Sequence, residues 1–242
     1  NIRSELTIGR ISATPDAGSG LTVEIGREAV RQACQRLIGW SAATAGQEGL
    51  FVSLKLSGHQ LRRSGTVTDI REAIDAAGIS PRRLMLEVTE ASVVDATEMA
   101  DTVMRELDEF GVRLCLGGFG VGPSALGRLH TLPFSMVKID RSFLTGAADD
   151  EARWRVYQGL LAMAGHLELR AVADGVEDRV QLEGVRRLGC QFGLGGLLSG
   201  PVEPAVAVRR FRDILTRPAS VVAVDIPIGL PDGPRDADRV CR

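Results

Sequence analysis

Lysine and the aromatic residues are scarce in this 242-residue chain. Of its 29 lysine and arginine residues only two are lysines, Lys55 and Lys138, and aromatic residues make up 4% of the sequence. Arginine therefore supplies almost all of the positive charge, and 31 acidic residues bring the net charge to −2. This balance lacks the basic surface that binding to a nucleic-acid backbone requires. We expect no nucleic-acid partner.

Long apolar runs and closely spaced cysteines are also missing. No run approaches the roughly 18 residues that a membrane helix needs, and the opening residues NIRSE are not typical of a signal peptide. The cysteines Cys34, Cys115, Cys190 and Cys241 lack metal-site spacing to one another or to the three histidines. The first three have apolar neighbours, as buried free thiols do. We expect no membrane segment and a reducing cytoplasm.

Apolar runs alternate with helical patterns along most of the chain. Strands are expected at 51–56, 84–88, 113–116, 134–139, 169–173 and 191–194, and helices at 67–77, 96–110, 124–129, 151–166, 179–188 and 203–215. This alternation predicts a parallel sheet with helices outside it. An open doubly wound sheet and a (β/α)8 barrel both satisfy the pattern. Both place functional residues at the carboxyl ends of the strands.

Charged residues stand where these apolar strands end. They are Lys55, Glu87, Glu90, Lys138, Asp140, Asp174 and Glu177. Each one alone is equally well explained as the first solvated residue past its strand. Because burying an unpaired charge is costly, a cluster of both signs at one rim predicts mutual pairing or a bound ligand.

The glycine-rich segment LGGFGVG follows the strand expected at 113–116. Its Gly120-x-Gly122-x-x-Ala125 spacing, with an aspartate about 20 residues later, has the form of a dinucleotide-binding turn. Pro123 argues against that function because it removes an amide donor, and the helix that follows is short. One interpretation is a dinucleotide-binding enzyme. The other is a former catalytic site that has lost its side chains.

Several short motifs, taken in order, resemble the EAL family, the (β/α)8-barrel phosphodiesterases of cyclic di-GMP. The chain contains SLKLS, LEVTE, LGGFGVGPSAL, VKIDRSF, ADGVED and LGCQFGLGG, where the family has S-x-N-L-S, E-x-T-E, D-D-F-G-T-G-x-S-x-L, K-I-D-R-S-F, A-E-G-V-E-T and L-G-C-D-x-x-Q-G-Y. The segment 20–40 is similar to the family's early strand, turn and helix. The resemblance implies a TIM-type barrel over 20–215. A divergent segment (1–19) without the E-A-L tripeptide precedes it, and an extension (216–242) follows.

The resemblance also implies hydrolysis by two divalent ions, Mg2+ or Mn2+, held at the strand ends. Most of the family's ligand positions have changed: an asparagine is Lys55, an aspartate pair is Gly117-Gly118 and a glutamine is Leu194. The catalytic remnants are Glu87, Lys138, Asp174 and Glu177. We therefore expect no cofactor and no metal. The expected function is a catalytically inactive regulatory or protein-interaction module in cyclic di-GMP signalling.

Two alternatives remain within the family. One is a metal-independent cyclic di-GMP receptor, with Lys138, Asp140 and Arg141 as ligand-binding candidates; the other is a residual phosphodiesterase. We expect cyclic di-GMP binding to be weak or absent, and a protein partner or a homodimer is left open. Lys55 is expected either to pair with Glu87 and Asp174 across the barrel mouth or to extend into solvent.

The N-terminal side of the barrel is expected to be incomplete. Eight strands require two before residue 51, and only 5–11 and 21–25 offer candidates. An open barrel exposes strand edges. The apolar segment VVAVDIPI in the C-terminal extension is one candidate for covering such an edge, and a remnant or tail is the other interpretation.

Overall fold

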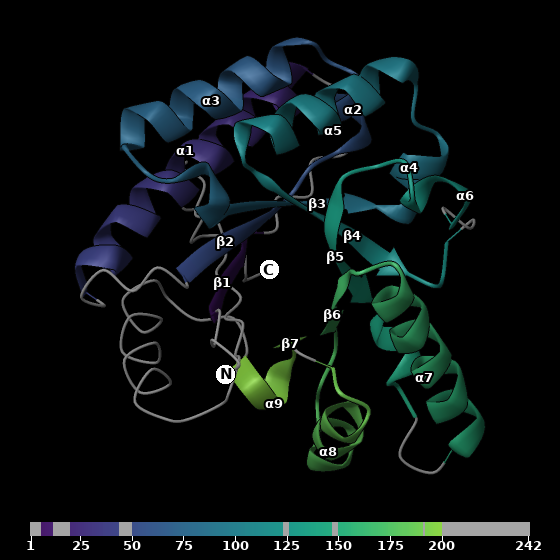
Figure 1. The fold of residues 1–242 in the computed structure, drawn as a ribbon. Helices are drawn as coiled ribbons and strands as arrows, with labels where there is room; N and C mark the ends of the chain where they lie inside the picture. The colour runs from purple at the N-terminus through teal and green to yellow at the C-terminus, as the bar shows by residue number, and fades with distance from the viewer. Residues whose placement is uncertain are drawn as a thin grey trace, which may run out of the picture.

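The chain folds as a curved parallel sheet with helices outside it (Figure 1). The computed structural model describes residues 6–11, 20–43, 50–122, 126–146, 150–190 and 192–199. The strands are β1 (Leu6–Ile11), β2 (Leu50–Lys55), β3 (Leu84–Thr89), β4 (Arg113–Phe119), β5 (Phe134–Ile139), β6 (Arg170–Ala173) and β7 (Phe192–Gly193). The helices are α1 (Gly20–Ala43), α2 (Gly58–Leu61), α3 (Gly65–Ala77), α4 (Glu90–Val94), α5 (Glu98–Phe110), α6 (Leu126–Leu129), α7 (Glu151–His166), α8 (Arg179–Arg187) and α9 (Gly196–Ser199), with 3-10 turns η1 (Pro81–Arg83) and η2 (Arg141–Phe143).

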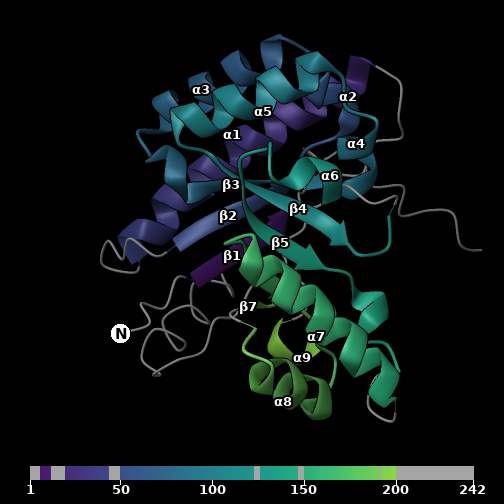
Figure 2. The ribbon, with the colours of Figure 1, turned by 45° about the vertical axis from the view of Figure 1, so that its right-hand side comes forward.

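The order of the strands decides between the two predicted architectures. Neighbours in the sheet are neighbours in the chain, from β1 to β7, and every pairing is parallel. A doubly wound sheet would reverse direction at a switch point. The sheet instead curves continuously, with α1, α3 and α5 outside its first strands and α7 and α8 outside its last strands (Figure 2). The fold is therefore a (β/α) barrel, and the dinucleotide-binding interpretation, which needed a doubly wound sheet, is wrong.

The alternation of side chains along each strand divides the core into two parts. Residues at one parity point between the strands and the helices, where they form the larger cluster. Residues at the other parity form a smaller cluster inside the curved sheet: Phe51, Met85, Cys115, Met136, Val172, Phe192 and Leu194. A filled interior of this kind is the packing expected of a (β/α) barrel. In the described part of the chain β1 and β7 are the edge strands.

The segment predicted as a possible strand at 21–25 is helical instead. Helix α1 runs without interruption from Gly20 to Ala43. Its buried residues include Val30, Cys34 and Leu37, which are spaced by three and four positions and lie on one helical face. The extended family-like strand expected within 20–40 is therefore wrong. The apolar residues at 21–25 match the start of this helical pattern as well as a strand.

Most other predicted elements are confirmed within one or two residues. The strands expected at 51–56, 84–88, 134–139 and 169–173 correspond to β2, β3, β5 and β6. Strand β4 is three residues longer than predicted, because it continues through Gly117 and Gly118. The helix expected at 203–215 and the segments 1–5, 12–19 and 216–242 lie outside the described residues. No described helix is both long and apolar enough to span a bilayer.

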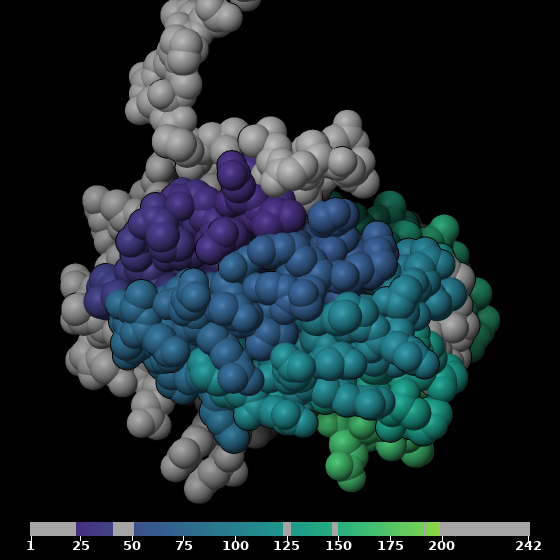
Figure 3. Space-filling model, turned by 90° about the horizontal axis from the view of Figure 1, so that it is seen from above, coloured from purple at the N-terminus to yellow at the C-terminus, as the bar shows by residue number. Residues whose placement is uncertain are grey.

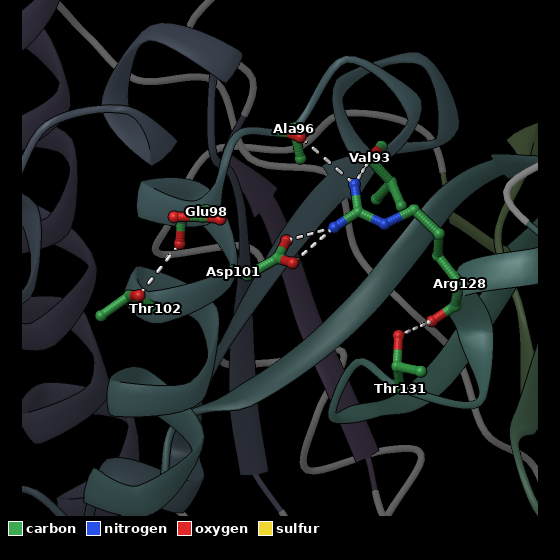
Figure 4. Close-up of polar contacts among 7 residues, drawn as sticks. All are labelled: Val93, Ala96, Glu98, Asp101, Thr102, Arg128 and Thr131. Carbon is green, nitrogen blue, oxygen red and sulfur yellow. Dashed lines mark hydrogen bonds and ion pairs between the residues drawn. The ribbon is translucent and has the colours of Figure 1, made fainter.

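One arginine joins three helices on the outer layer (Figure 4). Arg128 of α6 donates to both carboxylate oxygens of Asp101 on α5, each at 2.5 Å. The same guanidinium donates to the carbonyl of Val93 in α4 at 2.6 Å. The planar fork of arginine suits this combination of acceptors better than an ammonium does. Arg128 therefore fixes α4, α5 and α6 beside the carboxyl ends of β3 and β4.

Candidate functional site

Glu87 and Lys138 form a buried ion pair at the carboxyl ends of their strands. Lys138 Nζ donates to Glu87 Oε2, and the two side chains are 5% and 7% exposed. Glu87 belongs to β3 and Lys138 to β5, so the pair spans the intervening strand β4. Two charges at this depth require each other because neither retains much water. The fold therefore brings together two of the predicted catalytic remnants, Glu87 and Lys138.

Gly117 makes this pairing possible. A β-carbon added at Gly117 would lie 2.4 Å from Glu87 Oε1 and 2.8 Å from its Cγ. The carboxylate of Glu87 therefore occupies the space that a side chain on β4 would fill. Gly118 follows with a φ of +69°, a left-handed conformation that favours glycine. The two glycines stand where the resemblance expects an aspartate pair, and Gly117 admits the Glu87 side chain.

Replacing Gly117 by alanine should destabilise the protein. The added methyl group forces Glu87 away from Lys138, and overpacking of this kind costs about 1–3 kcal/mol. Gly159→Ala is the matched control, because nothing lies within 4 Å of a β-carbon at that exposed helical position. The control should be stabilising by up to about 1 kcal/mol through helix propensity. Urea denaturation measures both, and equal effects of the two changes would contradict this role of Gly117.

Lys55 does not make the predicted ion pair. Its Cα pairs in register with that of Glu87, yet its side chain is exposed, and no ion pair joins it to any described residue. The ammonium that reaches Glu87 is that of Lys138. The second alternative, extension of Lys55 into solvent, agrees with the structure. An exposed cation therefore stands at the end of β2.

The remaining candidates lie around β5 and β6. Arg141 Nη2 lies 3.8 Å from Asp174 Oδ1, with side-chain exposures of 59% and 13%. Asp140 caps η2, because its Oδ1 accepts from the backbone N–H of Ser142 at 2.9 Å. Among the described residues Asp174 has this contact with Arg141, and Lys55 makes no ion pair with it. Asp140 is engaged in local backbone structure, whereas Arg141 extends largely into solvent.

Glu90 anchors the glycine-rich loop. Its Oε2 accepts from the backbone N–H groups of Gly120 and Gly122 at 3.2 and 3.1 Å, and the residue is 4% exposed. The sequence predicts Glu90 at the end of a strand but does not predict that its carboxylate holds the loop. The feature of the sequence that could have predicted this contact is the pair Gly120 and Gly122, which follows the strand next to the one that Glu90 ends. These amides are consequently engaged by the protein itself.

Truncating Glu90 should loosen this loop and lower stability. Glu90→Ala leaves the two amides without their acceptor, and because Gly120 is exposed and Gly122 half-buried, we expect each lost hydrogen bond to cost about 0.5–1.5 kcal/mol. Glu90→Gln retains one carbonyl acceptor and should lose less. Equilibrium unfolding in urea distinguishes the two variants. A Glu90→Ala protein as stable as the glutamine variant would contradict the anchoring role.

Gln181 holds the loop after β6. Gln181 Oε1 accepts from the backbone N–H of Glu177 at 2.7 Å, and its Nε2 donates to the carbonyl of Leu144 at 3.0 Å. The Glu177 carboxylate is exposed and accepts no hydrogen bond from a described residue. Asp178 and Gln181 form a capping box at the start of α8. The D-x-x-Q spacing in the sequence was the signal for this arrangement.

The interior of the barrel beneath this ion pair is apolar, and the Cys115 thiol there is unreactive. Leu194 is 8% exposed and belongs to the inner cluster with Cys115. Burial raises the pKa of the Cys115 thiol to about 12, although the nearby Lys138 charge acts in the opposite direction. Cys34 lies outside this site, on α1, and burial likewise raises the pKa of its thiol to about 11. Both thiols therefore remain protonated at neutral pH and are poor nucleophiles.

The side chains at this rim do not fit a pair of divalent ions. Mg2+ and Mn2+ require several oxygen ligands, mainly carboxylates, at each ion. Gly117 and Gly118 offer none from their side chains, Leu194 is apolar, and Glu87 is bound to Lys138. Among the described residues no three His, Cys, Asp or Glu side chains cluster closely enough to hold a metal.

Comparison with known proteins identifies the family. Residues 12–201 match the EAL domain. The chain therefore belongs to the EAL family, whose solved relatives share its barrel architecture.

Two curated relatives come from Pseudomonas aeruginosa. The bifunctional diguanylate cyclase/cyclic di-GMP phosphodiesterase MucR is 33% identical over 184 residues, which cover 76% of this chain and 27% of MucR. The cyclic di-GMP phosphodiesterase NbdA is 33% identical over 193 residues, which cover 80% of this chain and 24% of NbdA. The chain thus spans about a quarter of the length of these relatives.

Two solved structures are similar in fold and sequence. The PaMucR phosphodiesterase in complex with c-di-GMP has a TM-score of 0.66 and 33% identity, covering 71% of this chain and 68% of that one. The EAL domain of Mycobacterium smegmatis DcpA has a TM-score of 0.75 and 30% identity, covering 80% of this chain and 86% of that one. Both similarities extend over most of the barrel.

Proposed function

We propose that this chain is a catalytically inactive EAL module that regulates or binds a protein partner in cyclic di-GMP signalling. The observation that carries the proposal is the Glu87–Lys138 ion pair, which passes through the space of the missing Gly117 side chain. The Glu87 carboxylate, which the resemblance makes a metal ligand, pairs here with an ammonium, and Gly117-Gly118 stands where the resemblance expects two more carboxylates. The family relatives supply the signalling context.

Electrostatics at the rim supports the loss of metal. An ammonium repels a dication. At an effective dielectric of 20, two unit charges about 4 Å apart interact by about 4 kcal/mol, and the repulsion between an ammonium and a dication is about twice that energy. Lys138 lies directly on Glu87, and the exposed Lys55 adds a second cation at the end of β2. Metal binding at Glu87 would therefore have to displace Lys138 without the ligands that normally offset such repulsion.

Incubation with cyclic di-GMP tests the proposal. The 242-residue chain, with Mg2+ or Mn2+ added, should release no linear dinucleotide, while the MucR phosphodiesterase serves as a positive control. Metal-dependent product formation that Glu87→Gln abolishes would overturn the proposal. The Glu87→Gln variant is needed because it distinguishes hydrolysis by this site from that by a contaminating enzyme.

A metal-independent cyclic di-GMP receptor is the second candidate. Two exposed cations favour it: Lys55 has no charged partner among the described residues, and Arg141 is 59% exposed beside Asp174. Such cations can contact phosphate without a metal. Calorimetric titration in EDTA should then show binding that Lys55→Ala and Arg141→Ala weaken. Absence of heat in EDTA would leave protein interaction as the function of the module.

A further inference from the structure

A groove of about 630 Å³ runs along the outer surface between α1 and α3. Figure 3 shows these two helices side by side on one face of the molecule. The residues that line it are Glu24, Arg27, Glu28, Arg31, Gln35 and Ile38 of α1 and Asp69, Glu72, Ala73, Ala76 and Ala77 of α3. Their spacing of three and four positions means that each helix presents one continuous face to the groove.

Part of the lining is small and apolar. Three alanines of α3 leave room for another backbone to approach closely, and Ile38 of α1 is 47% exposed at the opposite wall. The side chains of one helix pack into the groove on the surface of a neighbouring helix, and the two axes come closer when the residues at the contact are small. The shape of the surface therefore suits a helix laid along it.

The charge of the groove specifies what that helix carries. Asp69 is paired with Arg27 at 3.2 Å and also with Arg63. Glu28 is paired with Arg31. These pairs leave two exposed carboxylates, one on each wall.

Those two carboxylates are Glu24 on α1 and Glu72 on α3. Neither has a charged partner among the described residues. Four carboxylates line the groove against two lining guanidinium groups and Arg63, which pairs with Asp69 from outside the lining, so an excess of negative charge remains.

We propose that this groove binds a positively charged amphipathic helix of a partner protein. A small apolar face of that helix packs on the alanines and Ile38, and its flanking cations reach Glu24 and Glu72. The inference rests on the proposed interaction function but uses no residue of the barrel mouth. The peptide-binding experiment can therefore fail while the chain is still catalytically inactive, because the hydrolysis assay measures activity separately.

A fluorescent 16-residue helical peptide tests this proposal. The peptide carries alanine and leucine on one face and arginines beside it at i, i+4 spacing. Ala76→Arg places bulk and positive charge in the groove, and the matched control Ala162→Arg adds the same side chain at an exposed position of α7 that does not line it. We expect micromolar binding by fluorescence anisotropy, weakened at least tenfold by Ala76→Arg, unchanged by Ala162→Arg and reduced by added salt.

Three results would overturn the proposal. The first is absence of binding to the unsubstituted chain. The second is equal binding of a peptide in which glutamates replace the arginines. The third is a dimer in sedimentation velocity that Ala76→Arg dissociates, because it would make a second copy of this chain the occupant.

Discussion

Replacing Lys138 by methionine should lower the free energy of unfolding by about 3–5 kcal/mol, the range found when one partner of a buried ion pair is removed. Methionine keeps most of the volume of the lysine stem but removes its ammonium. Glu87 would then remain at 7% exposure without the ammonium of the pair. Urea denaturation followed by far-ultraviolet circular dichroism measures the loss.

The double variant Glu87→Leu with Lys138→Met is the decisive control. Apolar replacement of a buried pair is often neutral or stabilising, so the double variant should recover most of the stability lost by Lys138→Met. The control also keeps the prediction testable when the single variant fails to fold, because domains are only about 5–15 kcal/mol stable in total. If both variants lose the same stability, the cost belongs to packing at Lys138 and not to the ion pair.

Arg128→Met should lower stability by about 2–3 kcal/mol, since charge-assisted hydrogen bonds to Asp101 and a buried carbonyl acceptor are lost together. The guanidinium contacts α4 and α5 from α6, so its loss removes polar contacts among three helices at once (Figure 4). Arg128→Lys should recover only part of this stability, because an ammonium lacks the planar fork.

Arg155→Met supplies the matched control for Arg128. Arg155 contacts Glu151 at 3.4 Å, with side chains 70% and 93% exposed. Exposed pairs of this kind contribute about 0–1 kcal/mol, so the control should remain close to the unsubstituted protein. Equal losses at Arg128 and Arg155 in the same urea titration would contradict the bridging role of Arg128.

The fold could be predicted from the sequence because local patterns were strong. Apolar strand runs such as 134–139 and the helix at 151–166 correspond to β5 and α7 without change of bounds. The segment 21–25 failed because a short apolar run is ambiguous between strand and helix. Only the buried face that continues through Val30 and Leu37 shows that this run begins a long helix.

The candidate site was less accessible from the sequence, since the pairing depends on geometry across strands. Lys55 and Glu87 are register neighbours on adjacent strands, so their pairing was reasonable. Glu87 instead turns the other way, over β4, because Gly117 leaves space there and Lys138 stands beyond it. A missing side chain on the middle strand redirected the carboxylate, which a list of strand-end charges does not reveal.

Binding of Mn2+ to the 242-residue chain tests the central claim most directly. We predict that electron paramagnetic resonance titration detects no Mn2+ site that depends on Glu87, so the signal of free Mn2+ should be the same for the unsubstituted chain and for Glu87→Gln. Binding of one or two ions by the unsubstituted chain, abolished by Glu87→Gln, would contradict the claim. It would mean that the carboxylate leaves Lys138 to coordinate metal.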